Sequence, residues 1–142
     1  MNFSKIKLQM IQEKNYRYNS KIVKSARDIV KYINDIEELD KATEENMLLI
    51  CLNARNNIIA YSQVAKGGLD YCNIDLKTIF KTILLSNANK FILCHNHPSG
   101  TPKPSSKDIN VTSMIKDMSK VMGVQFLDHI IVANDDFVSC MC

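Results

Sequence analysis

The spacing of apolar and polar side chains divides the first part of the chain into a strand and a helix. Residues 6–12 alternate between apolar and polar types, which is the pattern of a half-buried β-strand. Further on, Ser25 is a suitable N-cap residue, and Asp28 follows it at the spacing seen at helix starts. The apolar stripe of this predicted helix consists of Ile29, Val30, Ile33 and Ile36.

The next segment has the pattern of a β-hairpin. Residues 47–52 are continuously apolar, and residues 53–57 have the composition of a turn. Residues 58–64 are again rich in β-branched and aromatic side chains. Two strands joined by a tight turn are therefore expected here.

A helix and a short strand follow the hairpin. Gly67 and Gly68 interrupt the strand pattern, and Asp75 is suited to cap a helix that runs to about Leu85. Residues 91–94 are apolar and too few for a helix, so they predict a short buried strand.

The last third of the chain predicts a loop, a helix and two strands. Residues 98–104 hold all three prolines of the chain, Ser105 begins a helix and Gly123 ends it. Residues 126–132 form the next strand, and residues 137–140 form one more. The residues near helical spacing on the helix are Ile109, Thr112, Met114, Ile115, Met118 and Val121. Strands and helices thus alternate, which indicates an α/β (mixed α+β) fold with helices packed on a mixed sheet.

The composition is that of one compact domain. A chain of 142 residues, 46% of them hydrophobic, buries roughly two thirds of its unfolded surface around one core. No apolar run approaches the roughly 18 residues of a membrane span, and no signal peptide is recognisable. The five cysteines are odd in number and form no C-x-x-C pair, so reduced thiols are expected. We therefore expect a cytoplasmic protein without a membrane partner.

The positive charge is concentrated near the N-terminus. The net charge is +3, whereas residues 14–31 hold six basic residues against Asp28, a local charge of +5. With Tyr16 and Tyr18 interleaved, this stretch could bind nucleic acid, although a solvated loop and helix face is the interpretation that we favour. We expect residues 1–24 to form an N-terminal strand and basic connecting segment, and residues 25–142 to form the compact domain.

The residues that indicate chemistry lie at the end of the strand at residues 91–94. In an extended segment, His95 and His97 point to one face while Asn96 faces away. Asp108 follows near the start of the next helix, where a proline-stiffened loop can bring it back to the strand end. Two nitrogens and a carboxylate oxygen form an open zinc site with a further position for water.

Each of these features also has a simpler interpretation. His95 alone is more typical of a structural histidine, and the pattern from Ser105 to Asp108 alone is a helix capping box. The capping box explains the aspartate, but it does not explain paired histidines in a chain that has only three. Together the residues favour a metal site.

At these residues the sequence resembles the JAMM (MPN+) metalloprotease family, whose signature is an upstream glutamate and the pattern H-x-H-x7-S-x2-D. The spacing from His97 through Ser105 to Asp108 matches the whole signature. Three further segments are similar to the RadC-like branch: H-N-H-P-S-G, the G-x-L near Gly68, and L-D-H-I-I-V at residues 127–132. The resemblance extends from about residue 25 to residue 140.

The resemblance implies a fold and a set of roles. The fold would be a JAB/MPN-like mixed sheet flanked by helices, with a cytidine-deaminase-like architecture. His95, His97 and Asp108 would bind zinc, and Ser105 would donate a hydrogen bond to the oxyanion. Glu45 would be the general base of a peptidase or isopeptidase that uses a zinc-activated water. Glu44 is its neighbouring competitor, but strand alternation sends the two side chains to opposite faces.

The chain also departs from the resembled family. Full-length RadC-like proteins carry a glycine-containing helix-hairpin-helix region that binds DNA, whereas the first glycine here is Gly67. We therefore expect a short form without this region, which weakens the DNA-repair role that the family suggests. Met47 and Asn53 replace the aromatic residue and the aspartate of the family's E-x-F-x4-L-D pattern. For His129, a structural or supporting role beside a polar neighbour is favoured over a place lining the site.

Two alternatives to a zinc peptidase stay open. A non-haem iron oxygenase uses the same set of two histidines and one carboxylate, although Ser105 and Glu45 have no role in it. A non-enzymatic module that binds DNA or a repair partner is the other. The sequence fixes neither the scissile bond nor the oligomeric state.

Overall fold

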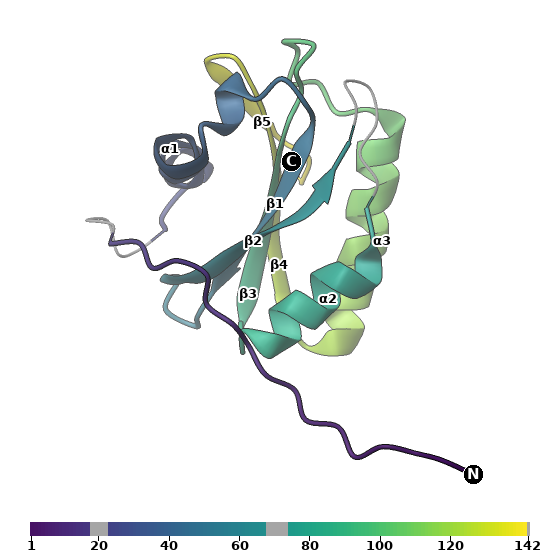
Figure 1. Ribbon diagram of the computed structural model, residues 1–142. Helices are drawn as coiled ribbons and strands as arrows, with labels where there is room; N and C mark the ends of the chain where they lie inside the picture. Colours follow the sequence, from purple (N-terminus) through teal and green to yellow (C-terminus); the bar gives the residue numbers. More distant parts are fainter. Residues whose placement is uncertain (18–22, 68–73, 142) are drawn as a thin grey trace.

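A five-stranded mixed sheet forms the centre of the computed structural model, which describes residues 1–17, 23–67 and 74–141. The strands lie in the order β2-β1-β3-β4-β5 (Figure 1). They are β1 (Asn46–Leu52), β2 (Ile58–Lys66), β3 (Lys90–Asn96), β4 (Gln125–Ala133) and β5 (Asp136–Ser139). Strand β3 pairs antiparallel with β1 and parallel with β4, and the other neighbours are antiparallel. The predicted fold class, a mixed sheet flanked by helices, is confirmed.

The helices cover both faces of the sheet. They are α1 (Ala26–Glu37), the short 3-10 helix η1 (Leu39–Lys41), α2 (Leu76–Leu85) and α3 (Ser106–Met122). Figure 1 shows α1 on one face, with α2 and α3 on the other. The alternation of side chains along the central strands therefore supplies two apolar cores. Leu49 and Leu93 pack toward α2 and α3, while Ile50 and Ile92 pack toward α1.

Local sequence signals determine where the elements begin and end. Ser25 and Ser105 are both N-caps of capping boxes, in which the side chain of the third helical residue also accepts a bond from the N-cap backbone. Asp75 caps α2, and Gly123 ends α3 with a φ of 71°. The predicted hairpin turn is also present, with Asn53 accepting backbone bonds across it. These predictions from the sequence are confirmed.

The predicted strand at residues 6–12 is wrong. Residues 1–17 contain no helix or strand, and Figure 1 shows this segment running away from the sheet. Ile6 and Ile11 are 81% and 83% exposed. Alternating side chains fix only the spacing of a possible apolar face, whereas a strand also needs a neighbour for its backbone hydrogen bonds. No such neighbour is present among the residues that the structure describes.

The apolar stripe expected on α3 is only partly correct. Ile115 is buried, but Ile109, Met114 and Val121 are exposed. The buried face of the helix is instead largely polar and consists of Asp108, Thr112, Ile115 and Ser119. A helix whose inner face carries polar side chains must satisfy their hydrogen bonds inside the protein. On α3, Asp108 accepts from the backbone of Ser105, and Thr112 bonds to His129 and to the Asp108 carbonyl.

The cysteines among the described residues form no disulfide bond. Cys51 and Cys94 are buried and free, and Cys140 is free and partly buried. Cys72, Cys142, and Gly68 and Leu69 of the G-x-L segment lie outside the described residues. Among the described helices, none is long and apolar enough to cross a membrane.

Deleting residues 2–12 tests the correction at the N-terminus. Because this segment is exposed and unpaired, the free energy of unfolding should change by less than about 0.5 kcal/mol. The measurement is urea denaturation followed by circular dichroism. As a comparison, Leu49→Ala opens a cavity in the core and should lower the free energy of unfolding by about 2–5 kcal/mol. A loss of that size on deletion would mean that the segment packs against the body.

Candidate metal centre

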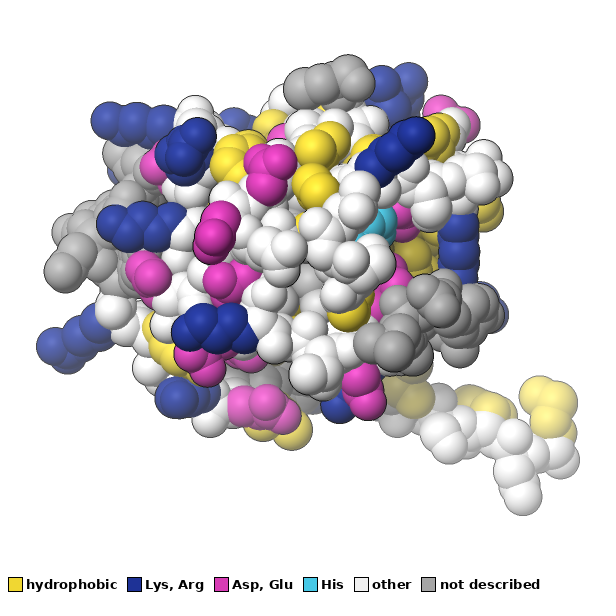
Figure 2. Space-filling view, turned by 90° about the horizontal axis from the view of Figure 1, so that it is seen from above, with side chains coloured by type: hydrophobic (Ala, Val, Ile, Leu, Met, Phe, Trp, Pro, Cys, Tyr) yellow, Lys and Arg dark blue, Asp and Glu magenta, His cyan; other side chains and the backbone are white. Residues whose placement is uncertain are grey.

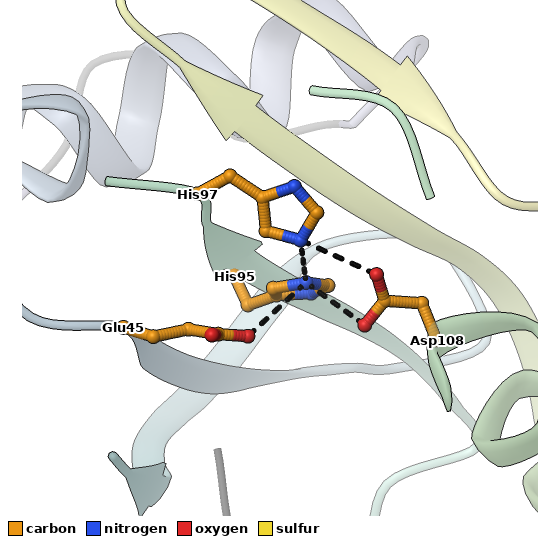
Figure 3. A group of neighbouring side chains, drawn as sticks. All are labelled: Glu45, His95, His97 and Asp108. Atoms are coloured by element: carbon orange, nitrogen blue, oxygen red, sulfur yellow. Dashed lines mark hydrogen bonds and ion pairs between the residues drawn. The ribbon is translucent and has the colours of Figure 1, made fainter. Parts of the chain in front are cut away.

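Four potential ligand side chains meet at one end of the sheet. Glu45, His95, His97 and Asp108 each offer a ligand atom, and these four atoms lie within 4.8 Å of one another. Figure 3 shows their side chains pointing toward a common point. They come from the start of β1, the end of β3, the loop after it and the start of α3. The structure thus brings together residues that are up to 63 positions apart, from 45 to 108.

Strand β3 delivers the two histidines. His95 is its penultimate residue and is fully buried, while His97 follows two positions later with its side chain 14% exposed. The backbone N–H of His97 still donates to Val132 of β4, which prolongs the extended path beyond β3. The two imidazoles therefore share the face of the sheet that α3 covers, as period-two geometry requires.

The loop after β3 turns sharply and fixes the ring of His97. Gly100 has a φ of 91°, a conformation in which glycine is strongly favoured. The turn places the carbonyl oxygen of Thr101 2.9 Å from His97 Nδ1. A carbonyl can only accept, so Nδ1 carries a hydrogen and Nε2 is the ring nitrogen that faces the centre.

The capping box of α3 holds Asp108 and Ser105. Asp108 Oδ2 accepts from the backbone N–H of Ser105 at 2.8 Å, and the Ser105 hydroxyl accepts from the backbone N–H of Asp108 at 3.1 Å. The positive end of the helix dipole also favours the carboxylate. Ser105 lies beside the four-residue group, and its hydroxyl keeps a hydrogen of its own to donate.

Glu45 reaches the centre from the start of β1, and Asn96 holds the backbone there. The Asn96 amide accepts from the N–H of Asn46 at 2.8 Å and donates to the carbonyl of Glu44 at 2.9 Å. It also donates to the carbonyl of Ala42 at 3.3 Å. The amide therefore binds the chain on both sides of Glu45. Asn96 faces away from the histidines, as predicted, but the sequence analysis gave it no role.

The structure separates Glu45 from its competitor. The Glu45 side chain is 11% exposed, with Oε1 3.7 Å from His95 Nε2. Glu44 is instead largely exposed and forms an ion pair with Lys66 at 3.3 Å. The two neighbouring carboxylates thus point to different environments, as the alternation along a strand requires.

The distances fit a metal held by two nitrogens and one carboxylate. His95 Nε2 lies 3.0 Å from His97 Nε2 and 3.3 Å from Asp108 Oδ1, and His97 Nε2 lies 3.2 Å from Asp108 Oδ2. Around a tetrahedral zinc with bonds of about 2.0–2.1 Å, neighbouring ligand atoms are roughly 3.3 Å apart. Two ring nitrogens at this spacing need a metal ion or a hydrogen between them. Nitrogen and oxygen ligands of this kind suit zinc and also iron.

Burial and the imidazoles shift the two carboxyl groups in opposite directions. Burial raises the pKa of Glu45 above its ordinary value, although His95 and His97 partly oppose this. Burial also acts to raise the pKa of Asp108, but the adjacent imidazoles of His95 and His97, together with the backbone N–H of Ser105, hold it well below the usual range. Asp108 is thus kept ionised as a ligand should be, and Glu45 is the carboxyl that accepts a proton more readily.

His129 stands behind His95 and does not face the open side of the centre. It lies on β4, is fully buried, and has Nε2 2.8 Å from His95 Nδ1. Burial, followed by the charge of His95, lowers the pKa of His129 to about 3, so the ring is neutral near pH 7. Polar neighbours on both ring nitrogens confirm the supporting position expected from the sequence.

The surface over the centre is open at His97. Of the three histidines, His95 and His129 are fully buried, so His97 alone reaches solvent. Figure 2 shows histidine atoms at the surface of this end of the molecule, next to acidic side chains. Among the four residues of the centre, His97 is therefore the one nearest to solvent.

The basic stretch at residues 14–31 is only partly described, because residues 18–22 lie outside the structure's described ranges. Within it, Lys14 lies over the ring of Tyr16, and Arg27 lies over the ring of Phe137. The binding of DNA by this stretch stays a prediction.

Comparison with known proteins adds to this geometry. The family model for the RadC-like JAB domain matches residues 23–141. A UPF0758 protein of Clostridium botulinum (strain Alaska E43 / Type E3) is 40% identical over 117 residues, covering 82% of this chain and 50% of that protein. A UPF0758 protein of Clostridium perfringens (strain ATCC 13124) is 38% identical over 112 residues, covering 79% and 48%.

A more distant relative gives the same picture. A UPF0758 protein of Desulfitobacterium hafniense (strain DSM 10664 / DCB-2) is 32% identical over 118 residues, covering 83% of this chain and 51% of that protein. The chain thus spans about half the length of these curated relatives, and their names state no activity.

Replacing Asn96 with leucine tests the clamp around Glu45, by which we mean the hydrogen bonds from the Asn96 amide to the backbone on either side of Glu45. Leucine has a similar size but removes the Asn96 bonds to the N–H of Asn46 and to the carbonyls of Glu44 and Ala42, and of these groups the Glu44 carbonyl still accepts from the Asn46 side chain. The free energy of unfolding should fall by about 2 kcal/mol or more, because partly buried polar groups lose hydrogen bonds. Urea denaturation measures the change. Gln63→Ala removes an exposed hydrogen bond to the Asn46 side chain and should change stability by less than about 0.5 kcal/mol. Equal effects of the two substitutions would contradict a clamp at Asn96.

Proposed function

The chain belongs to the family of RadC-like JAB domains, and from this premise we propose that it is a zinc-dependent hydrolase of amide bonds, a peptidase or isopeptidase. One observation carries the proposal. Two imidazole nitrogens and a carboxylate converge beside a second carboxyl group, that of Glu45, whose pKa is raised by burial (Figure 3). Ligands and base are thus present together, as hydrolysis by an activated water requires.

In this proposal His95 Nε2, His97 Nε2 and the Asp108 carboxylate hold the metal. A zinc ion in this position would supply Lewis-acid chemistry, lowering the pKa of a water molecule and polarising a substrate carbonyl. The protein's contribution is the fixed arrangement of the three ligands. The backbone of β3 sets both histidines, and the capping box of α3 sets the aspartate.

Glu45 is the general base and then the general acid. Its Oε1 takes a proton from the attacking water, whose oxygen forms a bond to the carbonyl carbon. Glu45 then returns the proton to the amide nitrogen as the carbon–nitrogen bond breaks. The raised pKa supports this double role, because a carboxyl with a pKa nearer to neutrality both accepts and releases protons efficiently.

Ser105 stabilises the negative charge that develops on the carbonyl oxygen. Its oxygen is fixed by the N–H of Asp108 at 3.1 Å, which leaves the hydroxyl hydrogen for an outside acceptor. A preorganised donor of this kind typically contributes about 2.7–4 kcal/mol to transition-state stabilisation.

The metal content of the purified protein is the first test. Protein made without an affinity tag or added metal should contain about one zinc per chain. The His97→Ala variant should lose most of it, because one of three ligands is removed. Elemental analysis gives both values.

A matched substitution controls for loss of metal through handling. Lys103 is an exposed residue of the same loop, so Lys103→Ala should keep the wild-type zinc content. Iron in place of zinc, together with oxygen consumption, would favour the oxygenase alternative. No metal in the wild type would leave a non-enzymatic binding module as the better interpretation.

Replacing Glu45 with glutamine tests the base. Glutamine keeps the size of the side chain but cannot take up a proton. The variant should retain zinc, and its rate of peptide or isopeptide cleavage should fall on the order of 100- to 10,000-fold. Cleavage is measured on a library of peptides and side-chain-linked peptides.

Glu44→Gln is the matched control, because it makes the same chemical change at an exposed neighbour that pairs with Lys66. It should leave both zinc content and cleavage near the wild-type values. Unchanged cleavage in Glu45→Gln, or loss of cleavage in Glu44→Gln, would refute the role given to Glu45.

A further inference from the structure

A chain of buried hydrogen bonds leads from α3 to the metal-facing ring of His95. Thr112 Oγ1 lies 2.6 Å from the carbonyl oxygen of Asp108 and 2.6 Å from His129 Nδ1. His129 Nε2 lies 2.8 Å from His95 Nδ1. Thr112, His129 and His95 are all buried, the two histidines completely. Water therefore does not compete for these bonds.

The direction of the first bond determines the direction of the others. A carbonyl oxygen only accepts, so the single hydroxyl hydrogen of Thr112 points to Asp108. The Thr112 oxygen must then accept from His129 Nδ1. The partners of the two nitrogens of this fully buried ring are a hydroxyl and an imidazole rather than a carboxylate, so the ring is neutral and Nδ1 carries its one hydrogen. Its other nitrogen, Nε2, has only a lone pair to offer.

The bond between the two histidines follows from this. Because His129 Nε2 accepts, His95 Nδ1 donates, and in the neutral ring that a metal requires, His95 Nε2 then has no hydrogen. That nitrogen is the one that lies 3.3 Å from Asp108 Oδ1 and 3.0 Å from His97 Nε2. Its lone pair is thus directed into the centre.

We propose that Thr112 and His129 are positioning residues that hold His95 in the Nδ1-protonated form, with its Nε2 lone pair ready for the metal. The proposal deepens the proposed function and rests on it, since it concerns the same centre. Partners behind metal-binding histidines fix both the ring orientation and the position of the hydrogen. Here the partner is another histidine, which is in turn fixed by a helix hydroxyl.

The two ligand histidines are fixed by different means. His97 Nδ1 donates directly to the carbonyl of Thr101 at 2.9 Å, so a backbone acceptor suffices. His95 lies deeper, beneath α3, and reaches a backbone carbonyl only through His129 and Thr112. That carbonyl belongs to Asp108. The two proposed metal ligands His95 and Asp108 are therefore joined by one continuous series of hydrogen bonds.

Without the hydroxyl of Thr112 the chain of bonds can reverse. His129 then gains nothing from a hydrogen on Nδ1 and can carry it on Nε2, where it donates to His95 Nδ1. His95 would be left with its hydrogen on Nε2, in the place of the metal. The Thr112 hydroxyl is separated from His95 by two hydrogen bonds. Its loss should therefore weaken metal binding.

The experiment compares Thr112→Val with Thr112→Ser. Valine keeps the shape of threonine and removes the hydroxyl, whereas serine keeps the hydroxyl and removes the methyl group. Zinc affinity is measured by competition with a chelator. The valine variant should bind zinc about 10- to 100-fold more weakly than the wild type. The serine variant should stay near the wild type even if its folding stability is lower.

Nitrogen-15 NMR of the histidine rings gives a second readout that does not depend on activity. In the zinc-free wild type, His129 should be protonated at Nδ1. In the zinc-loaded wild type, His95 should be protonated at Nδ1 as well. In Thr112→Val, a larger share of His129 should carry its hydrogen on Nε2.

The outcomes separate this proposal from the proposed function. Two results would overturn the positioning role of Thr112 and His129 while leaving the metal centre intact. One is equal zinc affinity of wild type and Thr112→Val, and the other is an Nε2-protonated His129 in the wild type. Conversely, a wild type that binds zinc and shows the expected ring states but cleaves no peptide would refute the proposed peptidase activity. The positioning role of Thr112 and His129 would then still stand. A wild type that binds no zinc would overturn the role of Thr112 and His129 in metal binding.

Discussion

His95 lies fully buried at the end of the central strand β3, where both nitrogens of its ring need polar partners. A buried polar group without a hydrogen bond costs about 1–3 kcal/mol, so the surroundings of this ring must supply acceptors or donors on two sides. His129 meets this need on one side, and on the other side Nε2 faces His97 and Asp108, where the proposed metal would bind. Much of the polar architecture of the protein follows from this one buried imidazole.

The start of α3 combines folding and chemistry in the same atoms. The capping box between Ser105 and Asp108 is an ordinary helix-starting device, worth about 1 kcal/mol. In this protein it also fixes one carboxylate oxygen, so that the carboxylate faces two imidazoles. The polar inner face of α3 continues one turn later with Thr112. A helix that packed only through apolar side chains could not hold these groups in place.

The two faces of the sheet divide the remaining tasks. The face under α2 and α3 carries the histidines, whereas Asn96 points to the opposite side and fastens the backbone on either side of Glu45. Strand alternation thus lets three consecutive residues serve two purposes: two imidazoles face the candidate metal centre, and the amide between them fixes the backbone around Glu45. Figure 3 shows the resulting approach of Glu45 to His95. The family match is consistent with this arrangement, and the relatives' names leave its chemistry open.

The sequence by itself determined what depends on neighbours along the chain. Helix caps such as Ser25 and Asp75, the hairpin turn at Asn53 and the pairing of His95 with His97 follow from short-range hydrogen bonds and from the two-residue period of strands. Partners from distant segments were decided only by the tertiary structure. The fate of residues 6–12, the polar face of α3, the clamp formed by Asn96 and the contact between His129 and Thr112 belong to this group. The physical reason is that such contacts join residues 17 to 54 positions apart, and local spacing does not encode which distant group will meet a buried side chain.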